Sequence, residues 1–333
     1  MVIQILKVMK NRHYILFLKL LIILHVLIST NSCENYVTGF EIGEQPKKLV
    51  LNAIISPDSI FVHLSNSIGV NDLLNINNWI LIEDATVVLF ENNEKIGNLE
   101  YVELVLFESY YFKTGYYTLR DFSPKIGVTY RIEVDYPGFP KISAETVIPS
   151  VPQSINIDTL RRFQKDEYGN DWIFDIIPEI INNNGKKNYY GFFVNLIYDD
   201  YIENIKHNVY YYTTSGSWVD FIRDEGWYTT PQVGDNNIES NYFFASDKGL
   251  SSEPFSMKFY LGSHLFQDMT IKAIEFNIVF FDSDLYAHLF SIARRYSSRD
   301  QDFFEEKVSI YSNVNNGLGI FGAKNSYSYI IIK

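Results

Sequence analysis

One glycine-rich stretch has the spacing that dinucleotide-binding turns use. The sequence GLGIFG, from Gly317 to Gly322, fits G-x-G-x-x-G, in which glycines let a strand-to-helix turn approach a pyrophosphate and an acid about 20 residues further on binds the ribose. Only 11 residues follow Gly322, and the letters YSYIII among them favour a strand. Neither the helix nor the acid has room, so we interpret the glycines as a turn or bulge before the final strand.

Nucleophilic and metal chemistry have little support in the residue spacing. The chain contains no G-x-S-x-G and no H-E-x-x-H. Beyond the apolar N-terminal segment four histidines remain, none close enough to another for a local ligand pair: His63, His207, His264 and His288. His288 lies among apolar neighbours of an expected helix, so we expect it to pack. We predict no catalytic residue, no metal and no cofactor.

Acidic residues are numerous and are expected mainly in solvated loops. Carboxylate pairs such as Asp199 with Asp200 could serve glycoside hydrolysis only if the fold set them about 5 to 9 Å apart across a cleft. The acid-rich turn KDEYGNDW, residues 165–172, offers oxygen ligands that suit calcium but lacks the calcium-loop spacing, and whether it binds calcium stays open. Asp282 to Asp284 is better explained as a helix cap.

An aromatic cluster is the strongest candidate for a binding surface. Trp218, Trp227 and Tyr228 lie close together in a loop-like sequence, and exposed aromatic faces stack on sugars or anchor a protein partner. Packing within a β domain explains the same residues equally well, so both interpretations stay open.

Cys33 is the only cysteine among the 333 residues, which leaves it no disulfide partner in this chain. Three zones precede it in the order of a secretory signal: a basic start, the apolar run from Tyr14 to Ile28 and a short run of small polar residues. The apolar run is interrupted by Lys19 and His25, so it is marginal for spanning a bilayer core of about 30 Å. A cleaved signal is favoured over an uncleaved anchor.

The residues around Cys33 also suggest a chemical fate for its thiol. The run from Ser29 to Cys33 resembles the lipobox of bacterial lipoproteins, in which cleavage before the cysteine precedes acylation. Each buried methylene contributes about 0.8 kcal/mol, so two or more acyl chains attach a protein stably to a membrane. We therefore predict lipid attachment at Cys33, against the alternative of a buried free thiol.

Composition indicates an exported protein that is mainly β. The formal charge is −12, and loss of the signal with its four basic residues makes it −16, which disfavours nucleic acid as a partner. The 25 Tyr and 25 Phe suit the pleated, half-buried surfaces of strands. About 300 mature residues exceed one comfortable hydrophobic core, so we expect two domains.

The pattern of strands and turns predicts the organisation. Residues 1–32 are a lipoprotein signal peptide, 33–47 a tether, 48–150 an immunoglobulin-like or prealbumin-like β-sandwich, and 151–333 a larger, aromatic-rich antiparallel β domain. The sandwich is predicted from short apolar runs, the Asn92-Asn93 turn and the alternation from Tyr130 to Tyr136. One helix is expected near residues 283–297, because Leu285, Leu289 and Ile292 follow helical spacing.

Four stretches together resemble a known family. KLVLNAIISPD, EDATVVLFENNEKIGNL, GVTYRIEVDYPGFPKISAETVIP and VSIYSNVNNGLGIFGA occur in this order behind the lipobox. They are similar to the Bacteroidota lipoproteins of domain of unknown function 4249, and the likeness runs from Cys33 to the C-terminus. The resemblance implies a lipid-anchored outer-membrane protein whose genes often lie beside TonB-dependent receptors. No catalytic residues are established for the family, so it implies none here.

These observations favour a non-enzymatic lipoprotein that assists an outer-membrane β-barrel receptor, such as a TonB-dependent transporter, by binding protein or ligand. A surface glycan hydrolase and a structural or adhesion protein are the alternatives. Surface-exposed lipoproteins of this phylum usually carry an acidic cluster after the cysteine, and here only Glu34 stands there. The sequence therefore leaves open whether the protein faces the surface or the periplasm.

Overall fold

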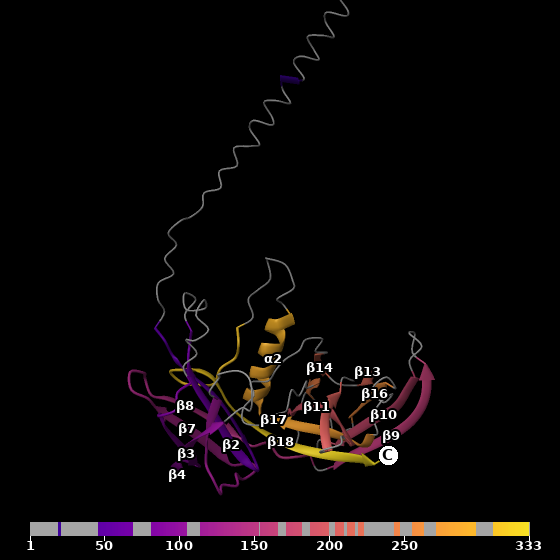
Figure 1. The fold of residues 1–333 in the computed structure, drawn as a ribbon, viewed down its shortest axis with the longest axis horizontal. Helices are drawn as coiled ribbons and strands as arrows, with labels where there is room; N and C mark the ends of the chain where they lie inside the picture. The colour runs from indigo at the N-terminus through magenta and orange to yellow at the C-terminus, as the bar shows by residue number, and fades with distance from the viewer. Residues whose placement is uncertain are drawn as a thin grey trace, which may run out of the picture. The chain divides into compact units, whose positions relative to one another are not determined.

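Alternation of buried and more exposed side chains marks several strands of this protein, such as Leu49–Ser56, Ser59–Asn66 and Thr129–Asp135. The computed structural model describes residues 19–20, 46–68, 81–104, 114–152, 154–165, 171–181, 187–199, 204–209, 212–216, 219–222, 243–246, 255–262, 271–297 and 309–332. The chain forms two compact units, Met1–Glu44 and Gln45–Lys333, and all named strands belong to the second unit (Figure 1). None of the helices in the described ranges is long and apolar enough to cross a bilayer.

Eight strands build the N-terminal part of the second unit. They pair as two sheet portions, β5-β6-β2-β1 and β4-β3-β7-β8. At the β3–β4 turn, Asn92 and Asn93 take positive φ of 48° and 70°, as a two-residue hairpin turn requires, which confirms the turn expected there. The strands are β1 (Leu49–Ser56), β2 (Ser59–Asn66), β3 (Thr86–Glu91), β4 (Glu94–Asn98), β5 (Glu100–Leu104), β6 (Thr114–Thr118), β7 (Thr129–Asp135) and β8 (Ile142–Val147).

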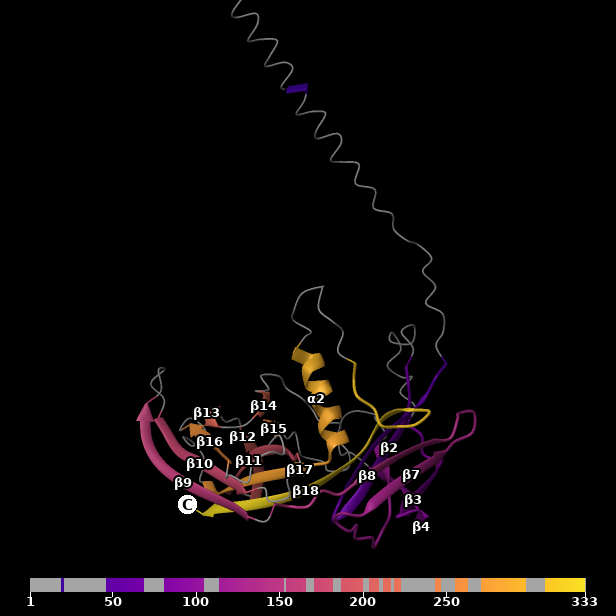
Figure 2. The same ribbon diagram turned by 180° about the vertical axis from the view of Figure 1, so that it is seen from behind.

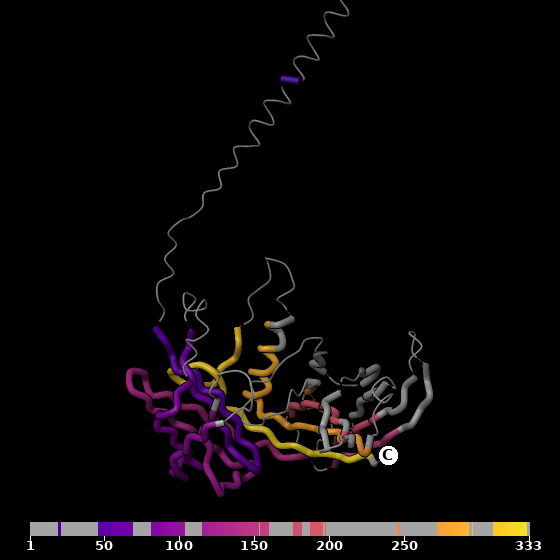
Figure 3. The backbone as a smooth tube through the Cα atoms, viewed as in Figure 1, coloured from indigo at the N-terminus to yellow at the C-terminus, as the bar shows by residue number. Residues whose placement is uncertain are grey.

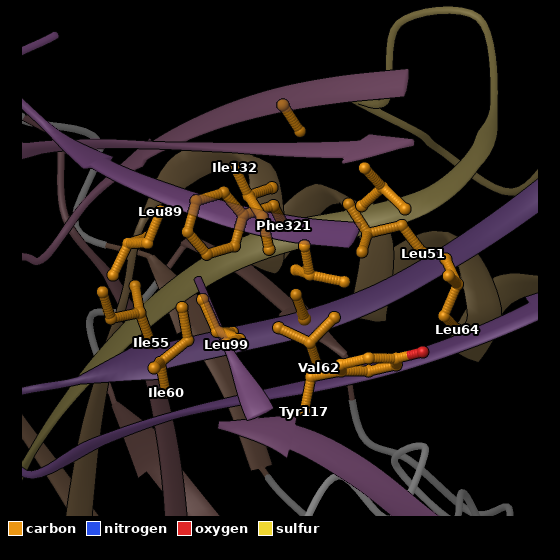
Figure 4. Packing of buried hydrophobic residues seen from close by; sticks show 14 of the residues in the cluster. Leu51, Ile55, Ile60, Val62, Leu64, Leu89, Leu99, Tyr117, Ile132 and Phe321 are labelled. Carbon is orange, nitrogen blue, oxygen red and sulfur yellow. The ribbon is translucent and has the colours of Figure 1, made fainter. Parts of the chain in front are cut away.

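The two portions enclose one apolar core, as a sandwich does (Figure 4). Leu51 and Val62 contribute from β1 and β2, and Leu89 and Ile132 contribute from β3 and β7. In β7 the buried residues alternate with partly or fully exposed ones as the sequence predicts, which places every second side chain in the core. Phe321, from the other end of the chain, is part of the same core. The predicted mainly β fold is confirmed.

The C-terminal part is also layered. A sheet in the order β13-β16-β10-β9 packs on the longer sheet that contains β11, β17 and β18, and aromatic side chains such as Phe192 and Phe276 fill the core between them. These strands are β9 (Ser154–Lys165), β10 (Asp171–Ile181), β11 (Tyr189–Asp199), β12 (Asn204–Val209), β13 (Tyr212–Gly216), β14 (Val219–Ile222), β15 (Phe243–Ser246), β16 (Phe255–Gly262), β17 (Ile271–Phe281) and β18 (Leu318–Ile332). The aromatic-rich β part that the sequence predicts is therefore present.

Strand β18 connects the two parts (Figure 3, yellow). Its first residues, Leu318 to Ala323, pair in parallel with β1, and Lys324 to Ile332 pair antiparallel with β17. The pairing of β18 with β1 is parallel because the two strands run in the same direction, although they come from opposite ends of the sequence. This pair therefore differs from the antiparallel pair of β18 with β17. Strand pairing thus crosses the boundary expected at residue 150.

Helix α2 (Ser283–Ser297) forms where the sequence predicts a helix. It directly follows β17 (Figure 2). Leu285 and Leu289 are buried against Val279 and Phe281 of β17 and Ile320 of β18. The apolar stripe of the helix therefore covers the face of the sheet opposite to the aromatic core, near the point where β18 passes from β1 to β17.

Candidate functional site at the junction of β8, α2 and β18

Several residues expected to carry function lie outside the described residues. These are Cys33, Trp218, Trp227 and Tyr228, and also positions 166–170 of the acid-rich turn. The lipid attachment, the aromatic binding surface and the calcium question therefore stay predictions. In the part of the chain that the structure describes, no three His, Cys, Asp or Glu side chains are grouped to hold a metal ion.

The most extensive polar arrangement centres on Asp282, between β17 and α2. Its Oδ1 accepts hydrogen bonds from the N–H groups of Asp284 at 2.8 Å and Leu285 at 3.0 Å, which caps the helix as expected. Its Oδ2 accepts from the Ala323 N–H and, at 3.2 Å, from the Thr146 hydroxyl. One carboxylate therefore joins β8, α2 and β18.

The electrostatic state of Asp282 follows from its surroundings. Burial raises the pKa of this carboxyl from 3.8 to about 6, although three backbone N–H donors oppose the rise and Asp284 adds to it. Ionisation of Asp282 therefore takes place within a mildly acidic range, and its hydrogen-bond donors hold the ionised form at neutral pH.

Asp284, Tyr311 and Asn313 form the outer part of the junction. The Tyr311 hydroxyl donates to Asp284 Oδ1 at 2.7 Å, and Asn313 Nδ2 donates to Asp284 Oδ2 at 3.1 Å. Asn313 Nδ2 also donates to the Phe321 carbonyl at 2.9 Å, while Asn313 Oδ1 accepts from the Phe321 N–H at 3.0 Å. The segment before β18 is thereby attached to both the helix and the strand.

His288 lies on the inner side of α2. Its Nδ1 lies 2.6 Å from the Tyr311 carbonyl oxygen, and burial lowers the pKa of the imidazole even though that contact raises it. The side chain is 4% exposed, so it packs, as the sequence suggests for a histidine among apolar neighbours. A neutral ring that donates from Nδ1 to this carbonyl satisfies the geometry.

The glycines of GLGIFG serve close packing around this junction. Gly317 lies in the turn before β18, as expected, whereas Gly319 and Gly322 lie within the strand itself. A Cβ atom on Gly319, which has φ of +100°, would meet the Leu51 carbonyl oxygen at 2.0 Å. A Cβ on Gly322 would meet Leu285 of α2 at 2.6 Å. The spacing that resembles a nucleotide-binding turn thus reflects two close contacts of β18.

A second polar arrangement, not identified in the sequence, lies on the helix-side face of the long sheet. Asn195 Nδ2 donates to Glu275 Oε2 at 2.9 Å, and the Ser328 hydroxyl donates to Asn277 Oδ1 at 2.6 Å. Glu275 and Asn277 are 9% and 5% exposed. The available signal was the pair of polar residues at alternate positions within the apolar sequence AIEFNIVFF.

The junction therefore connects elements through polar contacts. Asp282 is bonded from β8, α2 and β18, Asn313 is bonded to α2 and β18, and Asp284 of α2 accepts from the segment before β18. Such a network fixes the position of the final strand relative to the sandwich, which is a positioning role rather than a chemical one. Tyr311 and Asn313 belong to the sequence VSIYSNVNNGLGIFGA, so that stretch encodes this junction.

Comparison with known proteins bears on the whole chain. Neither a curated protein nor a solved structure matches it significantly. One family model, described as Domain of unknown function (DUF4249), matches residues 37–330, which include every strand of the second unit except the last two residues of β18. The chain therefore belongs to the DUF4249 family.

Proposed function

We propose that this protein is a lipid-anchored, non-enzymatic binding protein of the outer membrane that acts as an accessory subunit of a membrane-embedded β-barrel receptor, such as a TonB-dependent transporter. The observation that carries the proposal is the position of Cys33, the only cysteine, directly behind an apolar signal-like run and before a β-rich body. Membership of the DUF4249 family agrees with this interpretation.

The distance between the proposed anchor and the folded body supports a partner in the same membrane. Strand β1 begins at Leu49, 16 residues after Cys33. Even a fully extended connection of this length reaches only about 55 Å. A lipid on Cys33 would keep the β body near the membrane surface and would raise its effective concentration toward a membrane-embedded partner.

The formal charge of −12 also favours a protein partner over a bare anionic surface. An acidic body is repelled by anionic lipid headgroups and by nucleic-acid phosphates. Attachment would therefore depend on the acyl chains and on specific protein contacts. The net charge keeps the body soluble beside the membrane without holding it flat against the lipid.

The test is a pull-down of the full-length protein from native membranes, compared with Cys33→Ala and read by mass spectrometry. We expect a β-barrel receptor to be recovered with the unmodified protein and depleted with the variant, and we expect acyl chains in the mass of the mature protein. Ser32→Ala, which keeps the cysteine, is the matched control. Recovery of the protein alone after mild cross-linking contradicts the partner, and an unchanged mass for Cys33→Ala contradicts the lipid anchor.

A glycan hydrolase predicts a different result in the same material. The purified protein would release reducing sugars from envelope or host glycans, and a structural protein would instead change cell adhesion without changing nutrient uptake. Recovery of a receptor without sugar release supports the binding role. Release of sugars that depends on an acidic residue overturns it.

A further inference from the structure

Among the strands that the structure describes, β17 pairs with one edge of the second half of β18, and none pairs with the other edge. Residues of an antiparallel pair alternate between those that exchange backbone hydrogen bonds and those that direct their N–H and C=O groups away from the partner. The Asp282 N–H donates to the Ala323 carbonyl at 3.0 Å, so Ala323 directs its backbone groups toward β17. The pairing continues without a register shift to Ile332, so every second residue after Ala323 does the same.

The intervening residues therefore direct their backbone groups to the opposite edge. The side-chain contact between Ser328 and Asn277 agrees, because these residues face each other as a pair and side chains are closest where no backbone hydrogen bonds are exchanged. The Ser326 N–H is bonded at 2.9 Å by the side-chain Oδ1 of its own neighbour, Asn325. The residues in question are Lys324, Ser326, Ser328 and Ile330.

Strand β1 occupies this opposite edge only as far as Ala323. On the edge that faces β17, Asn313 bonds both backbone groups of Phe321, so β1 must bond β18 from the other side. Strand β1 ends at Ser56, and among the strands that the structure describes none pairs with β18 beyond that point on this edge. Figures 1 and 2 show β18 continuing along β17 to the end marked C.

The open edge has the composition of a strand that another strand covers. Ser326, Ser328, Tyr329 and Ile330 are exposed, and Ile330 is 55% exposed. Residues 325–332 contain no charge and no proline. Natural proteins usually protect a free edge with charges, prolines or bulges, because an unprotected apolar edge pairs with other chains. At Ser326 the N–H on this edge is already bonded by Asn325, whose Nδ2 also donates to the Pro149 carbonyl at 3.0 Å, and none of these devices interrupts residues 327–332.

The charges of the strand indicate what kind of segment fits. In a chain with a net charge of −12, residues 318–333 contain two lysines, Lys324 and Lys333, and no acid. A partner segment with uncharged β-forming residues in its middle and acidic residues at the end that lies beside Lys324 would complement this lysine.

We infer that the edge of β18 from Tyr327 to Ile332, next to Lys324, is a docking site for an extended, acid-flanked segment of a partner protein, which adds to the long sheet as a further strand. Backbone hydrogen bonds would supply the affinity, and Ile330 with Lys324 would select the segment. This inference rests on the proposed binding function and specifies how the partner is held.

The direct test uses a fluorescent synthetic peptide of about ten residues, a length that covers one strand, with alternating Thr and Val in the middle and two Asp at each end. It is titrated with the full-length protein in detergent. We expect saturable binding that is lost when alternate peptide amides are N-methylated, and that is at least about tenfold weaker when Lys replaces Asp.

Protein variants locate the binding. Ser328→Pro removes an N–H from the open edge, where proline is tolerated in strands, and should weaken binding at least about tenfold. Ser328→Ala loses the same hydroxyl but keeps the N–H, and should bind within about twofold of the unmodified protein. If Ser328→Pro does not fold, the N-methylated peptide still decides the question with the unmodified protein.

Three results overturn the inference: equal binding of the N-methylated peptide, equal binding by a folded Ser328→Pro, and equal binding of the Lys-ended peptide. A dimer that forms without peptide and is lost in Ser328→Pro would make a second copy the occupant and would also overturn it. In the membrane pull-down, a receptor recovered equally with Ser328→Pro leaves the proposed function intact and rejects the edge. Peptide binding without any receptor in the pull-down supports the docking edge and rejects the proposed function.

Discussion

Asn313 and Phe321 exchange hydrogen bonds as two paired strand residues do. Asn313 Nδ2 donates to the Phe321 carbonyl at 2.9 Å, and Asn313 Oδ1 accepts from the Phe321 N–H at 3.0 Å. A side chain therefore replaces a missing strand at the place where β17 has ended and β18 still pairs with β1. Phe321 itself is fully buried in the sandwich core, so this exchange keeps a core residue in position.

Replacing Asn313 should therefore destabilise the protein. Asn313→Ala leaves the Phe321 N–H and carbonyl without their partners, and each buried unpaired group costs about 1 to 3 kcal/mol. We expect a loss of about 2 to 4 kcal/mol in the free energy of unfolding, measured with urea. Asn315→Ala is the control, because Asn315 is exposed and its side chain makes only a long contact of 3.5 Å with Ser143. Equal stability of the two variants would contradict this role.

Gly319 should tolerate no side chain. Its φ of +100° disfavours other residues, and a Cβ atom would lie 2.0 Å from the Leu51 carbonyl oxygen, which is backbone and cannot rotate away. Gly319→Ala should cost about 4 kcal/mol or more and lower the melting temperature accordingly. Gly138→Ala is matched, since Gly138 has φ of +85° but open space around it, and should cost only about 1 to 2 kcal/mol.

Asp282 should make the free energy of unfolding decrease as the pH rises, which is opposite to the usual effect of a carboxyl group. Its pKa rises from 3.8 to about 6 on folding, so the folded state binds more protons between these values. Its contribution is fully present below about pH 3.8 and is lost as the pH rises through about 6, by about 3 kcal/mol. Urea unfolding between about pH 4 and 7 should show this slope in the unmodified protein and lack it in Asp282→Asn.

Glu91 provides a control of opposite sign. The hydrogen bond from Lys125 lowers the pKa of the Glu91 carboxyl, so its contribution is present above the ordinary value of 4.5 and is lost as the pH falls. Glu91 should make the free energy of unfolding increase as the pH rises, and Glu91→Gln should remove this increase. If the free energy of unfolding depends on pH equally in Asp282→Asn and in the unmodified protein, Asp282 keeps an ordinary pKa.

His288 should oppose Asp282 in mildly acidic solution. Burial lowers the pKa of its imidazole below 6.5, so its contribution to stability is present above about pH 6.5 and is lost as the pH falls through the lower folded-state value. NMR titration of the ring should give a pKa below that of a free histidine. His288→Asn, whose amide can still donate to the Tyr311 carbonyl, should keep most of the stability and lose this pH dependence. A ring that titrates above 6.5 would contradict the buried neutral form.

Sequence alone determined the local features of this protein. These features are local patterns in the sequence. They include the alternation from Tyr130 to Val134 and the cap and apolar stripe of the helix at residues 283–297. Such periodicity indicates which side of an element is buried, so the mainly β class and the helix at residues 283–297 could be predicted. The signal-like run before Cys33 is likewise a local pattern, although its consequence for the membrane stays a prediction.

Only the tertiary structure decided which distant elements meet. Leu51 lies beside Gly319, and Thr146 reaches Asp282, across separations that no periodic pattern encodes. The function of Asn313 as a strand substitute, the raised pKa of Asp282 and the open edge of β18 all follow from where β1 and β17 end. The burial of a residue and its hydrogen-bond partners depend on the side chains that pack around it. Those side chains come from distant parts of the sequence, so the residues beside it in the chain do not determine them.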